Sequence, residues 1–282
     1  MIFNKENYTV ETVTLGEESL RFRAFRNRIY VDKPINSEFQ QMHIFAPEAY
    51  YEGESVQGYT LEAAPIFMPN TVGGYMPGGL EEPGLHDGTG KKLTLDGNGN
   101  GSFKEHMESI VLASAQKALE QGIDLSDKEW LTIENGRAVA MDFHGYAEDI
   151  TRMKNPPAFD KLSMDSIEND LFGSATENFR HFTKYSREHS LAAGLMAEDS
   201  VIKMMNPMNY IEDEAAQTAF HWRIRHGECD RDTSLAISAM FVLKLRSGGH
   251  SVDYHAPWNV PHAGDYDLEE LFAWIDGICK EV

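Results

Sequence analysis

The sequence is short of basic residues. It has 25 Lys and Arg against 45 Asp and Glu, so its formal net charge is −20. Binding to the phosphate backbone of nucleic acids depends on clustered positive charge, and so does binding to anionic lipids. The composition therefore argues against a nucleic-acid partner and against a membrane partner.

Long apolar runs and cysteines are also scarce. No stretch approaches the roughly 20 apolar residues of a membrane-spanning helix. The first residues, Met1–Tyr8, lack the basic and apolar regions of a secretory signal. The two cysteines, Cys229 and Cys279, are too few for a disulfide framework and fit a reducing compartment. We therefore expect a cytoplasmic protein.

The remaining composition is that of a globular protein. With 282 residues, 41% of them hydrophobic, the chain suits one large domain or a core with a sizeable insertion. The sequence pattern changes twice along the chain. We predict that residues 1–79 form the N-terminal part of a core, residues 80–205 an inserted lid, and residues 206–282 the C-terminal part of the core.

Local patterns predict several elements in the first two parts. Alternating apolar and charged residues between Tyr8 and Tyr50 favour a β-meander. The apolar run Ala64–Met68 predicts a buried strand that leads into a glycine-rich loop. Apolar residues at helical spacing from Met107 to Leu119 predict a helix, with Gly122 at the position of a C-terminal cap.

The last part has the most regular pattern. It predicts a strand at Trp222–Arg225, a helix that carries Leu235 and stops at Ser247, a strand at Val252–Tyr254, and a final helix capped by Asp267 together with Glu270. Strand, helix, strand, helix is the order of a parallel α/β sheet.

Two loops that follow these strands carry an acid, Asp230, and a histidine, His262. In a parallel sheet, functional side chains gather at the carboxyl ends of the strands. A carboxylate that orients an imidazole forms two thirds of a nucleophile–base–acid triad. The alternative is that Asp230 is a turn residue and His262 an ordinary loop histidine, one of 11 in the chain.

Long motifs in the chain resemble bacterial tannases, which are α/β-hydrolase serine esterases with a large lid that cleave galloyl esters. The resemblance rests on His221–Ser234, Pro257–Asp267 and Gly58–Gly78, and it extends through the lid at Leu93–Gly101, Ala113–Leu119 and Arg152–Asp160. It implies a mostly parallel sheet with flanking helices and an inserted lid. It also implies a carboxylic ester hydrolase that acts on galloyl or related phenolic esters by a Ser-His-Asp mechanism and requires no cofactor.

The resemblance also implies roles for individual residues. Asp230 is the expected triad acid and His262 the expected base. Lys154, Glu168 and Asp232 are expected to contact the phenolic hydroxyls of a galloyl ring.

Alternatives stay open for the substrate contacts. Asp232 is placed to cap the following helix, and Lys154 and Glu168 would otherwise be solvated charges of the lid. The backbone N–H groups near Gly73 and Gly74 are the expected donors to an oxyanion.

The sequence departs from the family at the nucleophile. No serine lies in a Gly-x-Ser-x-Gly elbow, and Gly79–Leu85 runs almost directly into lid-like sequence at Asp87. We infer that an internal segment with the central nucleophile strand is missing, which predicts an inactive or impaired hydrolase. Cys229 is a weaker candidate for a substitute nucleophile, because nothing in the sequence brings His262 near it.

The missing segment suggests two further expectations. The alternative function is a non-catalytic module for phenolic-ligand binding or assembly. Sheet edges left uncovered by a lost strand would favour pairing with a second chain, so a homo-oligomer is also expected.

A further motif concerns calcium. Asp96, Asn98 and Asn100 match the front half of a calcium-binding loop, and a helix follows them. The twelfth position is Met107 instead of the expected glutamate. The alternative to a Ca²⁺ site is a glycine-rich turn.

Overall fold

The computed structural model describes residues 6–15, 18–29, 41–55, 84–151, 157–216, 218–262 and 266–280. The strand predicted at Ala64–Met68 lies outside these residues, as do Lys154, Gly73 and Gly74.

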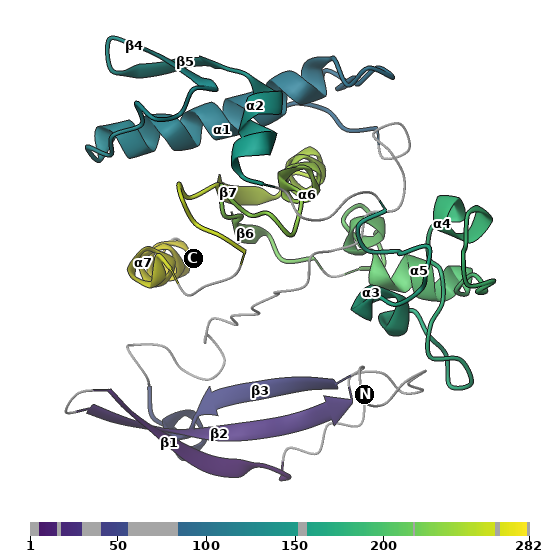
Figure 1. The fold of residues 1–282 in the computed structure, drawn as a ribbon. Helices are drawn as coiled ribbons and strands as arrows, with labels where there is room; N and C mark the ends of the chain where they lie inside the picture. Colours follow the sequence, from purple (N-terminus) through teal and green to yellow (C-terminus); the bar gives the residue numbers. More distant parts are fainter. Residues whose placement is uncertain are drawn as a thin grey trace.

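An antiparallel sheet forms the first part of the fold. Its strands follow chain order, β1 (Thr9–Leu15), β2 (Glu18–Ile29) and β3 (Gln41–Pro47), and the short 3₁₀ helix η1 (Glu48–Glu52) follows them. The predicted β-meander is therefore confirmed. Figure 1 shows this sheet on the opposite side of β6 and β7 from helix α1.

A long helix and a hairpin form the second part. Helix α1 (Ser102–Glu120) buries one apolar stripe, and Gly122 follows it in the left-handed conformation at φ +80°, as predicted. The antiparallel strands β4 (Leu131–Glu134) and β5 (Arg137–Met141) pack on α1, and α2 (Phe143–Asp149) follows.

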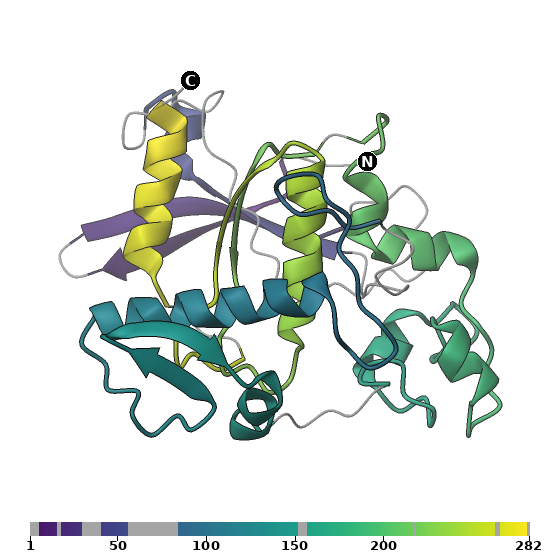
Figure 2. The same ribbon diagram turned by 90° about the horizontal axis from the view of Figure 1, so that it is seen from above.

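Three short helices lie apart from that hairpin (Figure 2). They are α3 (Ile167–Leu171), α4 (Lys184–Glu188) and α5 (Asp199–Met205), followed by the 3₁₀ helix η3 (Pro207–Tyr210). A small apolar cluster of their own holds this segment together, formed by Phe172, Phe182, Ala197 and Val201.

The last part is the predicted strand–helix–strand–helix unit. It consists of β6 (His221–Arg225), α6 (Leu235–Ser247), β7 (Ser251–His255) and α7 (Leu268–Lys280). Strands β6 and β7 are parallel, with Arg225 opposite His255. Among the described residues this is the one parallel pair of strands, since the other two sheets are antiparallel. The fold is thus mixed α/β, while a mostly parallel sheet stays a prediction.

The main apolar core joins the second and last parts. Val111 and Ala115 of α1 belong to the same buried cluster as Ala239 and Leu243 of α6. The division into a lid at 80–205 and core parts at 1–79 and 206–282 stays a prediction. In contrast to α1 and α6, α7 has no buried residue. No helix in the described part of the chain is long and apolar enough to cross a bilayer.

Candidate functional site

The candidate site is built on the two loops that leave β6 and β7. Backbone hydrogen bonds continue the strand pairing into these loops: the His226 N–H donates to the His255 carbonyl at 3.2 Å, and the Glu228 N–H to the Pro257 carbonyl at 3.0 Å. One more such bond joins the Cys229 N–H to the Val260 carbonyl at 3.2 Å. The two loops therefore run side by side for several residues beyond the sheet.

Gly227 allows this close approach. A Cβ atom at this position would lie 2.2 Å from the carbonyl oxygen of Val260 and 2.5 Å from that of Pro261. Both neighbours are backbone atoms, so no side-chain rotation could relieve the contact. Any other residue would push the second loop away from the first.

The paired loops bring Asp230 and His262 together. His262 Nδ1 lies 2.9 Å from Asp230 Oδ2, which confirms the predicted contact between these two side chains. The Asp230 side chain is 6% exposed and that of His262 is 48% exposed. The acid is therefore enclosed, and the histidine ring reaches solvent.

The second carboxylate oxygen of Asp230 organises its own loop. Oδ1 accepts hydrogen bonds from the backbone N–H groups of Asp232 at 2.8 Å and Thr233 at 2.9 Å. Burial acts to raise the pKa of Asp230, but the Thr233 N–H, the His262 ring and the Asp232 N–H together hold it below its ordinary value. Asp230 is thus a turn residue as well as the partner of His262, and it is ionised at neutral pH.

Asp232 does not cap the following helix, so the alternative role left open for it is wrong. The N-cap of α6 is Ser234, whose side chain accepts a hydrogen bond from the Ala236 N–H. Asp230 already holds the backbone at Asp232 in a turn two residues before the cap. The half-buried Asp232 carboxylate stays close to the acid–histidine pair instead.

Asp230, Asp232 and His262 could together hold a metal ion. Each offers one ligand atom, and these atoms lie within 4.8 Å of one another. Carboxylate and imidazole ligands suit first-row divalent metals such as Zn²⁺.

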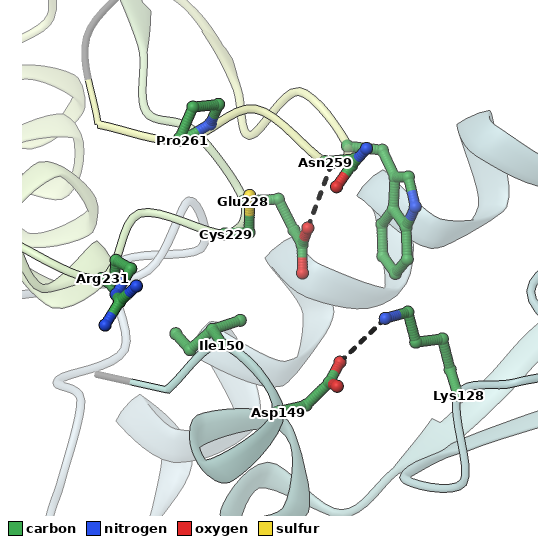
Figure 3. Close-up of a pocket in the computed structure, with 9 residues that line it drawn as sticks. Lys128, Asp149, Ile150, Glu228, Cys229, Arg231, Asn259 and Pro261 are labelled. Atoms are coloured by element: carbon green, nitrogen blue, oxygen red, sulfur yellow. Dashed lines mark hydrogen bonds and ion pairs between the residues drawn. The ribbon is translucent and has the colours of Figure 1, made fainter. Parts of the chain in front are cut away.

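A cavity of about 260 Å³ lies beside the site loops. It is lined by Lys128, Asp149, Ile150, Glu228, Cys229, Arg231, Trp258, Asn259 and Pro261. Figure 3 shows the Glu228 carboxylate pointing toward the Lys128–Asp149 ion pair, whose Nζ and Oδ2 atoms are 3.0 Å apart. Cys229 and Arg231 flank Asp230 in the chain, so the cavity wall and the acid share one loop.

Burial strongly shifts the pKa of Glu228. It raises the pKa of this carboxyl to about 7, although the Asn259 N–H donates to Oε2 at 3.2 Å. The Tyr146 hydroxyl of α2 donates to the Glu228 carbonyl at 2.6 Å, which ties the loop to the helix behind it. Sequence reasoning missed Glu228, because a single acid before Asp230 forms no recognisable motif.

An arginine–aspartate cluster anchors the end of the histidine loop. Asp267 Oδ2 accepts from Arg223 Nη2 at 2.6 Å and from Arg225 Nε at 3.0 Å. Arg225 also binds Asp253 of β7 at 2.8 Å. Asp267, which the sequence predicted to cap α7, has a left-handed backbone at φ +52° and directs its carboxylate to these arginines. The paired strands thus fix the chain on both sides of His262.

Glu168 and the predicted calcium loop lie on other elements of the described chain. Glu168 lies half-buried on α3, the short helix capped by Ser166. Asp96 Oδ1 accepts from the N–H groups of Asn98 at 2.8 Å and Asn100 at 2.9 Å, as in an ordinary turn, and Ca²⁺ binding there stays a prediction. Burial raises the pKa of Cys229, which disfavours the thiolate that a substitute nucleophile needs.

Solved structures identify the relatives of this fold. No protein-family model matches the chain, and neither does any curated protein. Tannin acyl hydrolase from Lactobacillus plantarum matches with a TM-score of 0.82 and 25% identity, over 99% of this chain and 98% of that chain. A structure of tannin acyl hydrolase in complex with ethyl gallate matches with the same values.

A tannase from a second organism agrees. The crystal structure of Fusobacterium nucleatum tannase matches with a TM-score of 0.81 and 27% identity, over 98% of this chain and 99% of that chain. The resemblance inferred from the sequence motifs is therefore confirmed by structure over nearly the whole length, and the chain is a tannase-like protein.

Proposed function

We propose that this chain binds galloyl or related phenolic esters at Asp230, Asp232 and His262, and that it derives from a tannase-type carboxylic ester hydrolase. The observation that carries the proposal is the 2.9 Å contact between His262 Nδ1 and Asp230 Oδ2 on a tannase-like fold. A similar protein has been solved with ethyl gallate bound, which supports a phenolic ester as the ligand class.

The hydrogen bond between Asp230 and His262 has a defined direction. Because Asp230 is ionised, it accepts a hydrogen bond from the N–H at His262 Nδ1 and leaves Nε2 as the basic atom of the ring. Nε2 can then take a proton from a serine hydroxyl or from water, and Asp230 stabilises the imidazolium that forms. The exposed ring makes this atom accessible from solvent.

Asp232 supplies recognition in this proposal. Its carboxylate lies within reach of the pair and can accept hydrogen bonds from phenolic hydroxyls. Glu168 and Lys154 would add an acceptor and a donor from the lid side. A trihydroxylated ring would then be preferred over a bare ring, because a site built for hydroxyls leaves polar groups unpaired when they are missing.

The hydrolytic step is impaired in this proposal, because the sequence has no Gly-x-Ser-x-Gly elbow. Without that serine, only substrate positioning and a general base remain. In triads whose other parts are intact, these accelerate the reaction about 10³ to 10⁴-fold over its rate in water. Loss of the central strand would lower this further. The same observation favours the second candidate function, a non-catalytic module that binds phenolic ligands or takes part in assembly.

Two measurements test the proposal. Isothermal titration calorimetry with gallate should show binding that weakens about tenfold in Asp232→Ala, while Asp127→Ala, which removes an exposed carboxylate outside the site, should match the wild type. Equal affinity in all three proteins would remove Asp232 from the site.

Hydrolysis of methyl gallate separates the two functions. We expect no burst and a rate far below that of a homologue with the elbow. Turnover of several per second that His262→Ala abolishes would show that another residue of this chain supplies the nucleophile.

A further inference from the structure

Another acid–histidine pair lies in the segment of short helices. His181 Nδ1 is 2.7 Å from Asp160 Oδ1, and His181 Nε2 is 2.8 Å from the hydroxyl oxygen of Ser190. These three side chains therefore form a continuous chain of hydrogen bonds from a carboxylate through an imidazole to a hydroxyl. This is the connectivity of a nucleophile–base–acid triad.

The surroundings of Asp160 fix the direction of these bonds. Asp160 is 2% exposed, and its Oδ2 accepts from the Phe182 N–H at 2.9 Å and the Thr183 N–H at 2.7 Å. The Asn169 side-chain amide donates to Oδ1 at 2.8 Å. Each of these partners is a donor, so the Asp160 oxygens act as acceptors and His181 donates to them from Nδ1. His181 Nε2 is then the acceptor, and Ser190 donates its proton to it.

The three groups are arranged by depth. The side chains of Asp160 and His181 are 1% and 0% exposed, whereas Ser190 is partly exposed and its chain neighbours His189 and Leu191 are exposed. The acid and the base are thus enclosed, and the chain of hydrogen bonds ends at a partly exposed residue. Enclosure of the acid and the base also strengthens the electrostatic coupling between them.

Backbone donors hold the Ser190 hydroxyl in place. The N–H groups of Ala192 and Gly194 both point at its oxygen, each at 3.3 Å. Because these two groups donate to the oxygen, its own proton is left for His181 Nε2. Residues close to Ser190 in the chain expose apolar surface, since Leu191 is 79% exposed and Tyr185 is 57% exposed. Such surface suits an aryl group.

We propose that Ser190, His181 and Asp160 form a nucleophile–base–acid set, which accepts the acyl group of small aryl esters. Ser190 Oγ attacks the ester carbonyl, and its proton passes to His181 Nε2. The Oγ–acyl bond forms, the bond to the aryl oxygen breaks, and the phenolate leaves with the proton from His181. Water then hydrolyses the acyl-serine in the same way. The reaction needs no other reagent.

This set is independent of Asp230 and His262. It lies next in the chain to residues of a separate hydrophobic cluster, Phe159 and Phe182, and it shares no residue with the first site, so its function does not depend on gallate binding there. The competing explanation is that the three side chains serve only to hold the short helices together. Reactivity at Ser190 separates the two explanations, because a purely structural hydroxyl has no reason to be acylated.

The test is covalent labelling of the full chain with an alkyl fluorophosphonate. Attack by Ser190 forms an Oγ–P bond and releases fluoride, and the adduct is located by peptide mass spectrometry. We expect one adduct per chain on the peptide that contains Ser190, and its loss in Ser190→Ala. Ser163→Ala is the matched control, because Ser163 is exposed in the same segment and donates to Asp165 at 2.7 Å instead of to a histidine. Its labelling should equal that of the wild type.

Release of p-nitrophenol from p-nitrophenyl acetate provides a second readout. Ser190→Ala should abolish the initial burst, and His181→Gln should slow labelling at least about 100-fold if the variant folds. Ser190→Ala removes a single partly exposed hydroxyl, so circular dichroism should show a native spectrum for it. Absence of an adduct on Ser190 in the wild type, or an adduct that persists in Ser190→Ala, would overturn the proposal.

Discussion

The Asp230–His262 pair and the Asp160–His181 pair have nearly equal geometry in opposite environments. His262 meets Asp230 at 2.9 Å and is half exposed, whereas His181 meets Asp160 at 2.7 Å and is fully enclosed. The first pair is held by two loops at the end of parallel strands. The second is held by hydrogen bonds inside a segment with little apolar core. The comparison shows that the same side-chain contact can depend on backbone pairing between loops, as for Asp230 and His262, or on buried hydrogen bonds, as for Asp160 and His181.

The largest expected effect is on the enclosed pair. Asp160→Ala leaves His181, Asn169 and two backbone N–H groups without their acceptor in a buried setting, so we expect a loss of about 3–5 kcal/mol in the free energy of unfolding. Urea unfolding followed by circular dichroism measures it. Asp165→Ala, at an exposed carboxylate of the same segment, should stay within about 0.5 kcal/mol of the wild type. Similar losses in both variants would contradict the assignment.

The second effect concerns the pH dependence beside the exposed pair. The pKa of Glu228 is raised from 4.5 to about 7 in the folded state, so folding favours the protonated form. Stability should therefore fall as the pH rises from about 4.5 toward 7, and the penalty should be complete above 7.

Glu228→Gln removes this penalty. It keeps an acceptor for the Asn259 N–H and should be more stable than the wild type at pH 8 by on the order of 2–3 kcal/mol. At pH 4 the two proteins should be nearly equal in stability. Thermal unfolding at both pH values measures the difference, and a gain of the same size at pH 4 would rule out ionisation as its cause.

A third effect tests how Asp230 holds its loop. Asp230→Ala removes the acceptor for the Asp232 and Thr233 N–H groups and should cost about 1–3 kcal/mol. Asp230→Asn keeps a carbonyl acceptor and should cost less. Because the folded-state pKa of Asp230 is lowered, the stability that its charge contributes is present above about pH 4 and is lost as the pH falls through the folded-state value. Chemical unfolding of the three proteins at pH 7 ranks them, and equal costs for Ala and Asn would contradict this role.

The smallest effect checks the reassigned helix cap. Ser234→Ala should destabilise the protein by about 0.5–1 kcal/mol, because it removes the side chain that caps α6. Asp232→Ala leaves that cap in place and should change stability by less than about 0.5 kcal/mol. Urea unfolding of the two variants decides between them, and the reverse order would restore Asp232 as the cap.

The two pairs also differ in how well the sequence predicts them. Regular strand and helix patterns bracket Asp230 and His262, and strand-exit loops meet at one edge of a sheet, so their contact could be predicted. Asp160, His181 and Ser190 lie in irregular segments around the short helices, without hydrophobic periodicity. Their contact depends on tertiary folding that no local pattern encodes. The sequence left the capping role of Asp232 open, because Asp and Ser have similar cap preferences, and only the backbone turn made by Asp230 decides between them.

Gly227 has a consequence for the evolution of this protein. It carries no functional group, yet its missing side chain lets the acid and histidine loops touch along their backbones. In a saturation library, every substitution at this codon should therefore be as damaging as a change in the acid or the histidine themselves. Selection for the Asp230–His262 contact thus also preserves Gly227, which contributes only the absence of a side chain.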